Sequence, residues 1–274
     1  SPVLKVVCAI IFLVAFTVYV ASAFNAGTTV FCAVLPWFAD HKQLAMLIFA
    51  AIILVYTFMG GYKAVCWTDF FQGLLMLVAL VSTPFIMLFV GKFDASFAGA
   101  FAEGITEFGS NPFAASWTDI ISGLGWGLGY FGMPHILVRF MSIEKPSMVK
   151  KSATVAIVWV VLSLGATCLI AYFGRMLLAE QLLTIGAQKT VFITFARMLF
   201  PGFIAGILMA AIIAASMSTA DSQLLVASSS FTSDVYKPIL RKNASEKEIL
   251  WVGRIVVLIV SIIGFMIASS KAEG

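Results

Sequence analysis

Apolar stretches of about twenty residues recur along the whole chain, and they constrain its fold more than any other feature. A helix of about that length crosses the ~30 Å hydrocarbon core of a bilayer. Hydrophobic residues make up 61% of the 274 positions and charged residues 11%, whereas soluble domains have about 45–50% and about a quarter. These values exclude soluble enzymes, nucleic-acid binders and disordered proteins. The sequence therefore predicts an all-α protein that crosses a membrane several times.

The apolar stretches predict seven membrane-spanning helices in a single domain over residues 1–274. They cover residues 5–33, 43–59, 67–91, 117–140, 149–175, 202–232 and 249–270. The connections after the second, fourth and sixth helices hold most of the loop Lys and Arg residues, which places these connections in the cytoplasm. The chain opens with Ser1 rather than Met and ends just after the last helix, so we expect further spans at both ends of the protein.

Two longer connections are predicted on the outer side of the membrane. Residues 91–116 mix acidic and small residues, and residues 178–200 are typical of a short amphipathic helix at the interface. The apolar face of that helix would carry Val191, Phe192, Phe195, Met198 and Leu199.

No pattern of catalytic or metal-ligating residues appears in the sequence. The four cysteines lie singly in apolar runs, which indicates neither a disulfide framework nor a zinc site. Since no nucleophile–base arrangement is recognisable either, we expect no enzymatic activity and no organic cofactor.

The fourth predicted span is rich in residues that interrupt helices. Five glycines and one proline lie between positions 123 and 135; each interior Gly costs about 1 kcal/mol and Pro about 3 kcal/mol relative to Ala. Transporters use such broken helices to hold solutes and ions, and Trp126 and Tyr130 would share a face of any surviving helix. Alternatively, the GxxxG spacings Gly123/Gly127 and Gly125/Gly129 favour close helix packing.

The sixth predicted span has a polar face. Ala215, Ser218, Thr219 and Ser222 follow the i, i+3, i+4, i+7 spacing that places residues on one side of a helix. Hydroxyl and carbonyl oxygens are the ligands that hard cations prefer. The alternative is that Ser and Thr only bond to carbonyls of the preceding turn or join neighbouring helices.

Two carboxylates add to this polar face. Asp69 and Asp221 lie in or near predicted spans, where ionisable residues are costly and are functional candidates by default. Asp69 has a structural alternative as the N-cap of the third span.

Three segments resemble the sodium/solute symporter family, and most closely its bacterial branch that transports proline. They are residues 56–65 (YTFMGGYKAV) leading into 67–72 (WTDFFQ), residues 125–132 (GWGLGYFG) with 134–137 (PHIL) and 139–141 (RFM), and residues 217–219 (MST) with 222–225 (SQLL). The resemblance implies part of a five-plus-five inverted-repeat bundle of the leucine-transporter type, with the seven spans as core helices three to nine. It also implies a multi-pass protein of the bacterial cytoplasmic membrane.

The resemblance further implies particular site residues. The carbonyl of Ala215 and the hydroxyls of Ser218 and Thr219 would hold a coupling Na⁺. The substrate-side residues would be Tyr19, Trp126, Tyr130 and Pro134. Asp69, Asp221 and Ser222 would serve a second cation or sodium exit, and Asp221 departs from the proline branch, where a small residue is usual.

The predicted function is sodium-coupled uptake of a small organic solute, with L-proline favoured and with Na⁺, solute and bilayer as partners. Pantothenate, a sugar or sialic acid stays open as the solute. A symporter-like sensory module attached to a signalling protein is the alternative from another class.

Overall fold

The computed structural model describes residues 2–94, 98–100, 102–104, 115–130, 132–178, 181 and 187–272. All regular secondary structure in these ranges is helical. The chain divides into two compact units, one formed by Ser1–Met76 with Met209–Gly274 and the other by Leu77–Leu208.

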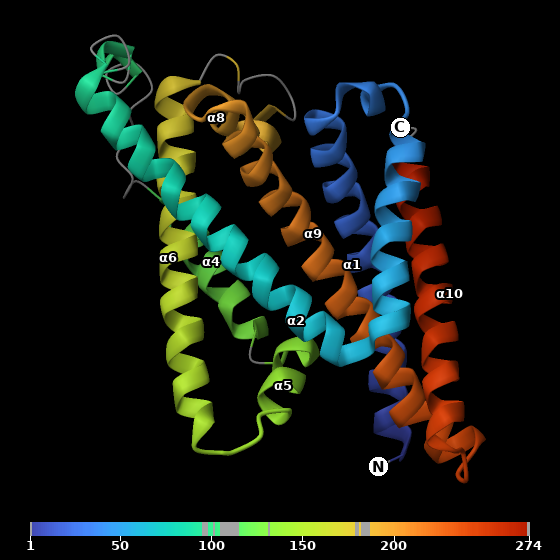
Figure 1. Cartoon of the computed structure of the whole chain (residues 1–274). Coiled ribbons are helices and arrows are strands. Elements are labelled where there is room, and N and C mark those ends of the chain that lie inside the picture. Colours follow the sequence, from blue (N-terminus) through green and yellow to red (C-terminus); the bar gives the residue numbers. More distant parts are fainter. Residues whose placement is uncertain are drawn as a thin grey trace. The chain divides into compact units, whose positions relative to one another are not determined.

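The first unit packs four long helices around an apolar core. It contains α1 (Pro2–Val34), the first part of α2 (Lys42–Phe93), most of α9 (Gly202–Ser230) and α10 (Glu246–Ala272), together with the short η1 (Pro36–Ala39) and η3 (Phe231–Leu240). α1 and α10 run along each other (Figure 1). Phe24 of α1, Phe49 of α2, Leu224 of α9 and Val257 of α10 meet in the core. Each of the four long helices therefore buries one side in this core and leaves another side exposed.

Helix α2 is bent, and this bend stands where the sequence predicted a loop after the second span. The predicted spans 43–59 and 67–91 belong to one helix, which is interrupted only at Gly61 with φ 59° and ψ −161°. Essentially only glycine adopts this conformation, because any Cβ would be strained there. The helix resumes directly after the bend and leaves in a new direction (Figure 1).

The second unit is built from the end of α2 and a set of shorter elements. These are α4 (Trp117–Tyr130), α5 (Pro134–Met141), α6 (Met148–Leu177), η2 (Ala187–Thr190) and α8 (Val191–Leu199). Phe195 of α8 is fully buried and packs with Phe173 of α6 and Met87 of α2. The predicted amphipathic helix is thus present as α8, which begins at Val191 directly after η2, although Met198 of its apolar face is 50% exposed.

Five helices of the described part are long and apolar enough to cross a membrane. They are Val3–Val34, Lys42–Val90, Met148–Leu177, Gly202–Leu240 and Glu246–Ser270. α2 contains two of the predicted spans, and the fourth predicted span, 117–140, consists of the two short helices α4 and α5. The sixth span continues through η3 to Leu240 instead of ending at residue 232. The count of seven spans stays a prediction, and most of the connection 91–116 lies outside the described residues.

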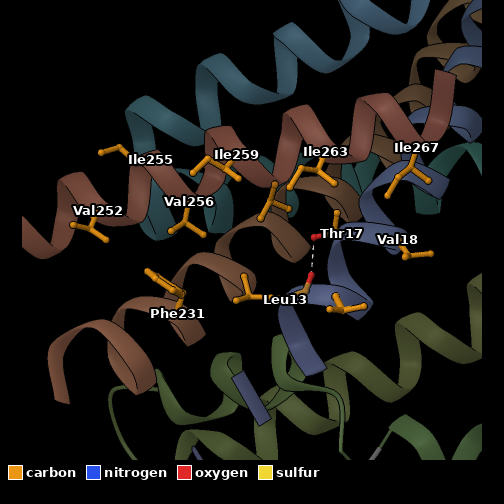
Figure 2. Close-up of a pocket in the computed structure, with 12 residues that line it drawn as sticks. Leu13, Thr17, Val18, Phe231, Val252, Ile255, Val256, Ile259, Ile263 and Ile267 are labelled. Carbon is orange, nitrogen blue, oxygen red and sulfur yellow. Dashed lines mark hydrogen bonds between the residues drawn. The ribbon is translucent and has the colours of Figure 1, made fainter. Parts of the chain in front are cut away.

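An apolar groove of about 530 Å³ follows α1 and α10 in the first unit (Figure 2). Its α10 side presents Val252, Val256 and Ile263, and its α1 side presents Leu13 and Thr17. The Thr17 hydroxyl donates to the Leu13 carbonyl at 2.6 Å, so the polar side chain of the lining is engaged within its own helix. The groove therefore offers little to a polar solute.

Candidate functional site

The fourth predicted span is broken between α4 and α5. α4 ends at Tyr130, α5 begins at Pro134, and the Gly132 N–H donates to the Gly129 carbonyl at 3.1 Å in the turn between them. Pro134 has no N–H, and its ring would clash with the carbonyl four residues earlier, that of Tyr130. Met133, directly before it, is extended at φ −69° and ψ 112°, as residues before proline usually are. The predicted break is confirmed.

The position of the break differs from the expected one. Four of the five glycines are helical within α4, so the backbone leaves the helix after the glycine run instead of within it. No described atom lies within 4 Å of the place where a Cβ would stand on any of these four, Gly123, Gly125, Gly127 and Gly129. Close helix packing through the GxxxG spacings therefore has no support among the described residues.

A small pocket lies beside the break. It has a volume of about 280 Å³ and is lined by Gly127, Tyr130, Ile136, Leu137 and Phe140. Three apolar side chains of α5 and one tyrosine ring thus surround a space that suits a small, largely apolar group. The sequence interpretation named Tyr130 but not the three α5 residues, whose spacing could have indicated one face of the helix after Pro134.

The other predicted substrate residues, Trp126, Pro134 and Tyr19, belong to three different helices. Pro134 is the first residue of α5, and Trp126 lies in α4, four residues before Tyr130, with a side chain outside the described residues. Tyr19 lies in α1 and is 44% exposed. Since α1 belongs to the first unit and α4 to the second, the pairing of Tyr19 with Tyr130 stays a prediction.

The polar face of α9 is present as predicted. Thr219 Oγ1 donates to the carbonyl oxygen of Ala215 at 3.0 Å, a bond to the preceding turn that a structural role alone would explain. Ser218 differs, because its hydroxyl donates to a residue of another helix, Asp69 Oδ1 on α2, at 2.6 Å. Ser222 Oγ lies 3.4 Å from the other oxygen, Asp69 Oδ2. The face is therefore more than a set of backbone contacts.

Asp69 is not a helix cap. It lies inside α2, eight residues beyond the bend at Gly61, so the N-cap alternative is wrong. The structure instead brings it against two hydroxyls of α9 that are far away in the sequence. Carboxylate and hydroxyl oxygens of Asp69, Ser218 and Ser222 consequently form one oxygen-rich cluster within membrane-length helices.

Asp221 is held by a partner that the sequence interpretation missed. Its side chain is fully buried, and Oδ2 accepts a hydrogen bond of 2.7 Å from the hydroxyl of Tyr56 on α2. The same hydroxyl lies 3.5 Å from the Met217 carbonyl oxygen. Asp221 Oδ1 is buried without a hydrogen-bond partner among the residues that the structure describes. A buried carboxylate requires donors, which is the signal that could have prompted a search for a tyrosine.

The bend in α2 connects these contacts. Tyr56 precedes Gly61 and Asp69 follows it, yet both reach the stretch of α9 from Met217 to Ser222. A straight helix would separate residues 56 and 69 by about 20 Å along its axis. The glycine conformation therefore gathers two α2 side chains on one turn and a half of α9.

Comparison with known proteins gives matches that extend over essentially the whole chain. The family model described as "Sodium:solute symporter family" matches residues 1–274. The chain is 39% identical over 275 residues to the sodium/proline symporter of Escherichia coli (strain K12), with 98% of this chain and 54% of the relative covered. It is 37% identical over 278 residues to the "High-affinity proline transporter PutP" of Bacillus subtilis (strain 168), covering 99% and 57%.

A solved structure supports the fold. The chain matches a structure described as the substrate-bound outward-open state of a Na⁺-coupled sialic acid symporter with a TM-score of 0.77 and 21% identity, over 97% of this chain and 58% of that one. The chain spans about half the length of the curated relatives that it matches. Since the family model extends over every residue, the chain belongs to the sodium:solute symporter family.

Proposed function

We propose that the protein is a secondary active symporter that couples the inward movement of Na⁺ to the uptake of a small organic solute, with L-proline favoured. The observation that carries the proposal is the 2.6 Å contact of Ser218 with Asp69, because it joins oxygen ligands of two membrane-length helices at the hydroxyl face. Curated relatives described as proline transporters, at 37 and 39% identity, support the choice of solute.

The coupling ion is assigned to the face of α9. The Ala215 carbonyl and the Ser218 and Thr219 hydroxyls supply neutral oxygen ligands of the kind that Na⁺ accepts. The bond from Thr219 to Ala215 already holds two of these oxygens 3.0 Å apart. We assign a second cation, or sodium exit, to Asp69, Asp221 and Ser222. A bound cation stabilises a buried carboxylate by pairing with its negative charge.

The solute is assigned to the broken helix. Trp126, Tyr130 and Pro134 border or precede the break, and Tyr19 of α1 is assigned to the opposing side. The pocket beside Tyr130 offers apolar walls and a phenolic ring, which suit a small cyclic side chain, while freed backbone groups at the break suit the polar ends of an amino acid. The α5 residues Ile136, Leu137 and Phe140 join this list.

The proposed architecture is a five-plus-five inverted-repeat bundle, in which this chain supplies core helices three to nine as one transporter domain. The fold likeness at a TM-score of 0.77 supports it. We assign the start of α1 and the loop after η3 to the cytoplasmic side of a bacterial cell membrane, because the connections predicted on that side are rich in Lys and Arg.

Transport then follows alternating access. Na⁺ bound at the hydroxyl face stabilises the outward-open arrangement and helps to order the broken helix, so that the solute binds more tightly; both sites then open inward. Coupling between two binding sites is reciprocal, so the solute must raise the affinity for Na⁺ by the same factor.

The test is uptake of labelled proline by the protein in proteoliposomes, with an inward Na⁺ gradient and with competing amino acids, pantothenate, sugars and sialic acid. We expect uptake that requires Na⁺ and is inhibited by excess proline. Na⁺-dependent uptake that only another solute inhibits would change the substrate. Absence of any Na⁺-driven uptake would favour the sensory module.

A further inference from the structure

Arg254 is a charged residue within the membrane-length helix α10. It lies eight residues after the helix begins at Glu246, or about 12 Å along the axis. Its guanidinium carbon is 5.0 Å from the centre of the Trp251 ring and 5.3 Å from that of Phe58 on α2. The two rings meet edge to face with centres 6.3 Å apart. Arg254 thus lies against a corner made by two aromatic side chains of one compact unit.

This aromatic corner leaves the hydrogen-bonding capacity of Arg254 unused. No hydrogen bond or ion pair joins its guanidinium to any residue that the structure describes, although the group carries five N–H donors. Contact with a ring face stabilises the positive charge but does not accept five N–H bonds. Arginine within a membrane helix costs about 2.5–3.5 kcal/mol at the centre, and the cost is relieved where the side chain reaches the interface or an anion.

A second basic residue lies on the same side of α10. Lys247, Trp251 and Arg254 follow the i, i+4, i+7 spacing, so they form one stripe that runs from the helix start toward the aromatic corner. Lys247 is exposed and Trp251 is 55% exposed. Since Arg254 is half-buried, the stripe is open to the surroundings of the protein at Lys247 and Trp251 and partly covered at its inner end.

Nearby acidic residues do not neutralise this stripe within the described part. Glu248 accepts a 2.7 Å bond from Tyr236 and forms an ion pair with Arg241 at 3.1 Å. Glu246 lies next to Lys247 in the chain but is in no ion pair with it. Two positive charges about two helical turns apart consequently lack an anion among the described residues.

We propose that this stripe binds the phosphate of an anionic phospholipid, with Arg254 and Lys247 as donors and with Trp251 and Phe58 as the aromatic wall. Basic residues between membrane helices at the cytoplasmic side are suited to acidic headgroups, and the start of α10 lies at the end that the basic loops mark as cytoplasmic. The planar guanidinium fork matches phosphate oxygens in a bidentate way. This lipid site is independent of the sodium and solute sites.

The proposal is tested by lipid retention in native mass spectrometry. The purified protein in neutral detergent is titrated with dioleoyl phosphatidylglycerol or dioleoyl phosphatidylcholine. We expect preferential retention of phosphatidylglycerol, reduced about fivefold in Arg254→Gln, since a basic residue near an anionic surface contributes about 1 kcal/mol. Arg254→Lys should lose part of the preference, because it keeps the charge but not the fork.

Lys5→Gln is the matched control, because Lys5 is an exposed basic residue at the start of α1 that does not belong to the stripe. Equal retention of the two lipids, or a loss in Lys5→Gln as large as in Arg254→Gln, would overturn the proposal. Displacement of phosphatidylglycerol by millimolar inorganic phosphate would indicate a site for a free anion and would overturn the lipid assignment. If Arg254→Gln does not fold, Lys247→Gln gives the same test, and unchanged retention there would be equally decisive.

Discussion

The polar stretch of α9 and the break between α4 and α5 are both irregular features of membrane-length segments, but they are built in opposite ways. Side chains of α9 bond to α2 over 2.6–2.7 Å, and Asp221 at its centre is fully buried. Around the break, Tyr130 is 49% exposed, and no described atom lies within 4 Å of the place where a Cβ would stand on any of the four glycines of α4. The polar side chains of α9 are thus already held together by hydrogen bonds, whereas the break presents an open apolar pocket.

This difference fits the two cargoes proposed for them. A cation requires fixed oxygens, since its ligands must replace a hydration shell, and buried hydrogen bonds hold such oxygens in place. A solute must enter and leave during each transport cycle, which an exposed pocket beside irregular backbone permits. The comparison therefore predicts that substitutions in the polar stretch of α9 have large effects on Na⁺ affinity or stability, whereas substitutions at the break have small effects.

The sharpest test removes a single oxygen from the α9 region. Ser218→Ala should raise the Na⁺ concentration for half-maximal uptake roughly ten- to a hundredfold, because a hydrogen bond to a charged group contributes about 1.5–3 kcal/mol. Ser216→Ala is the control, since its hydroxyl lies 3.4 Å from the Ile212 carbonyl of its own helix. Equal Na⁺ dependence in the two variants would remove the ion-site assignment.

The buried Tyr56–Asp221 bond should matter for stability. Tyr56→Phe leaves a second carboxylate oxygen without a donor and should lower the free energy of unfolding in detergent by about 1.5–3 kcal/mol. In a double-mutant cycle, Tyr56→Phe should cost less when Asp221 is already Asn. Additive losses would mean that the bond does not couple the two residues.

The bend at Gly61 allows both Tyr56 and Asp69 to contact α9, so replacing Gly61 by any residue with a side chain should disturb these contacts. Gly61→Ala places a Cβ at φ 59° and ψ −161°, and should cost about 1–3 kcal/mol of unfolding free energy. It should also weaken Na⁺ affinity more than solute affinity. Gly73→Ala, at a helical position of α2 with open space around it, should be neutral or stabilising. Similar effects of the two substitutions would contradict a special role of the bend.

The smallest effect is expected at the break. Tyr130→Phe removes one hydroxyl from an exposed pocket and should weaken apparent proline affinity about two- to tenfold, in line with a net hydrogen bond of about 0.5–1.5 kcal/mol. The Na⁺ dependence measured in the same uptake assay should stay nearly unchanged. Leu124→Ala, 70% exposed in α4, is the control. Parallel losses of Na⁺ and proline affinity would indicate general damage to the fold.

The sequence by itself determined the membrane class, the helical content, the presence of a break in the segment that contains Pro134, and the common face of Ala215, Ser218 and Thr219. Each of these depends on local rules, namely the length of apolar stretches, the missing N–H of proline and the 3.6-residue period. Such rules act within one segment, so they are readable without knowing its neighbours.

Only the tertiary structure decided which residues meet across helices. Ser218 and Asp69 are 149 positions apart in the chain, and Asp221 and Tyr56 are 165 apart. In a bilayer both the lipid side and the protein side of a helix are apolar, so hydropathy does not reveal which face meets which neighbour. The bend at Gly61 determined that α2 brings both Tyr56 and Asp69 to α9. Two adjacent glycines in the sequence permit the backbone conformation of this bend, but they do not by themselves predict it.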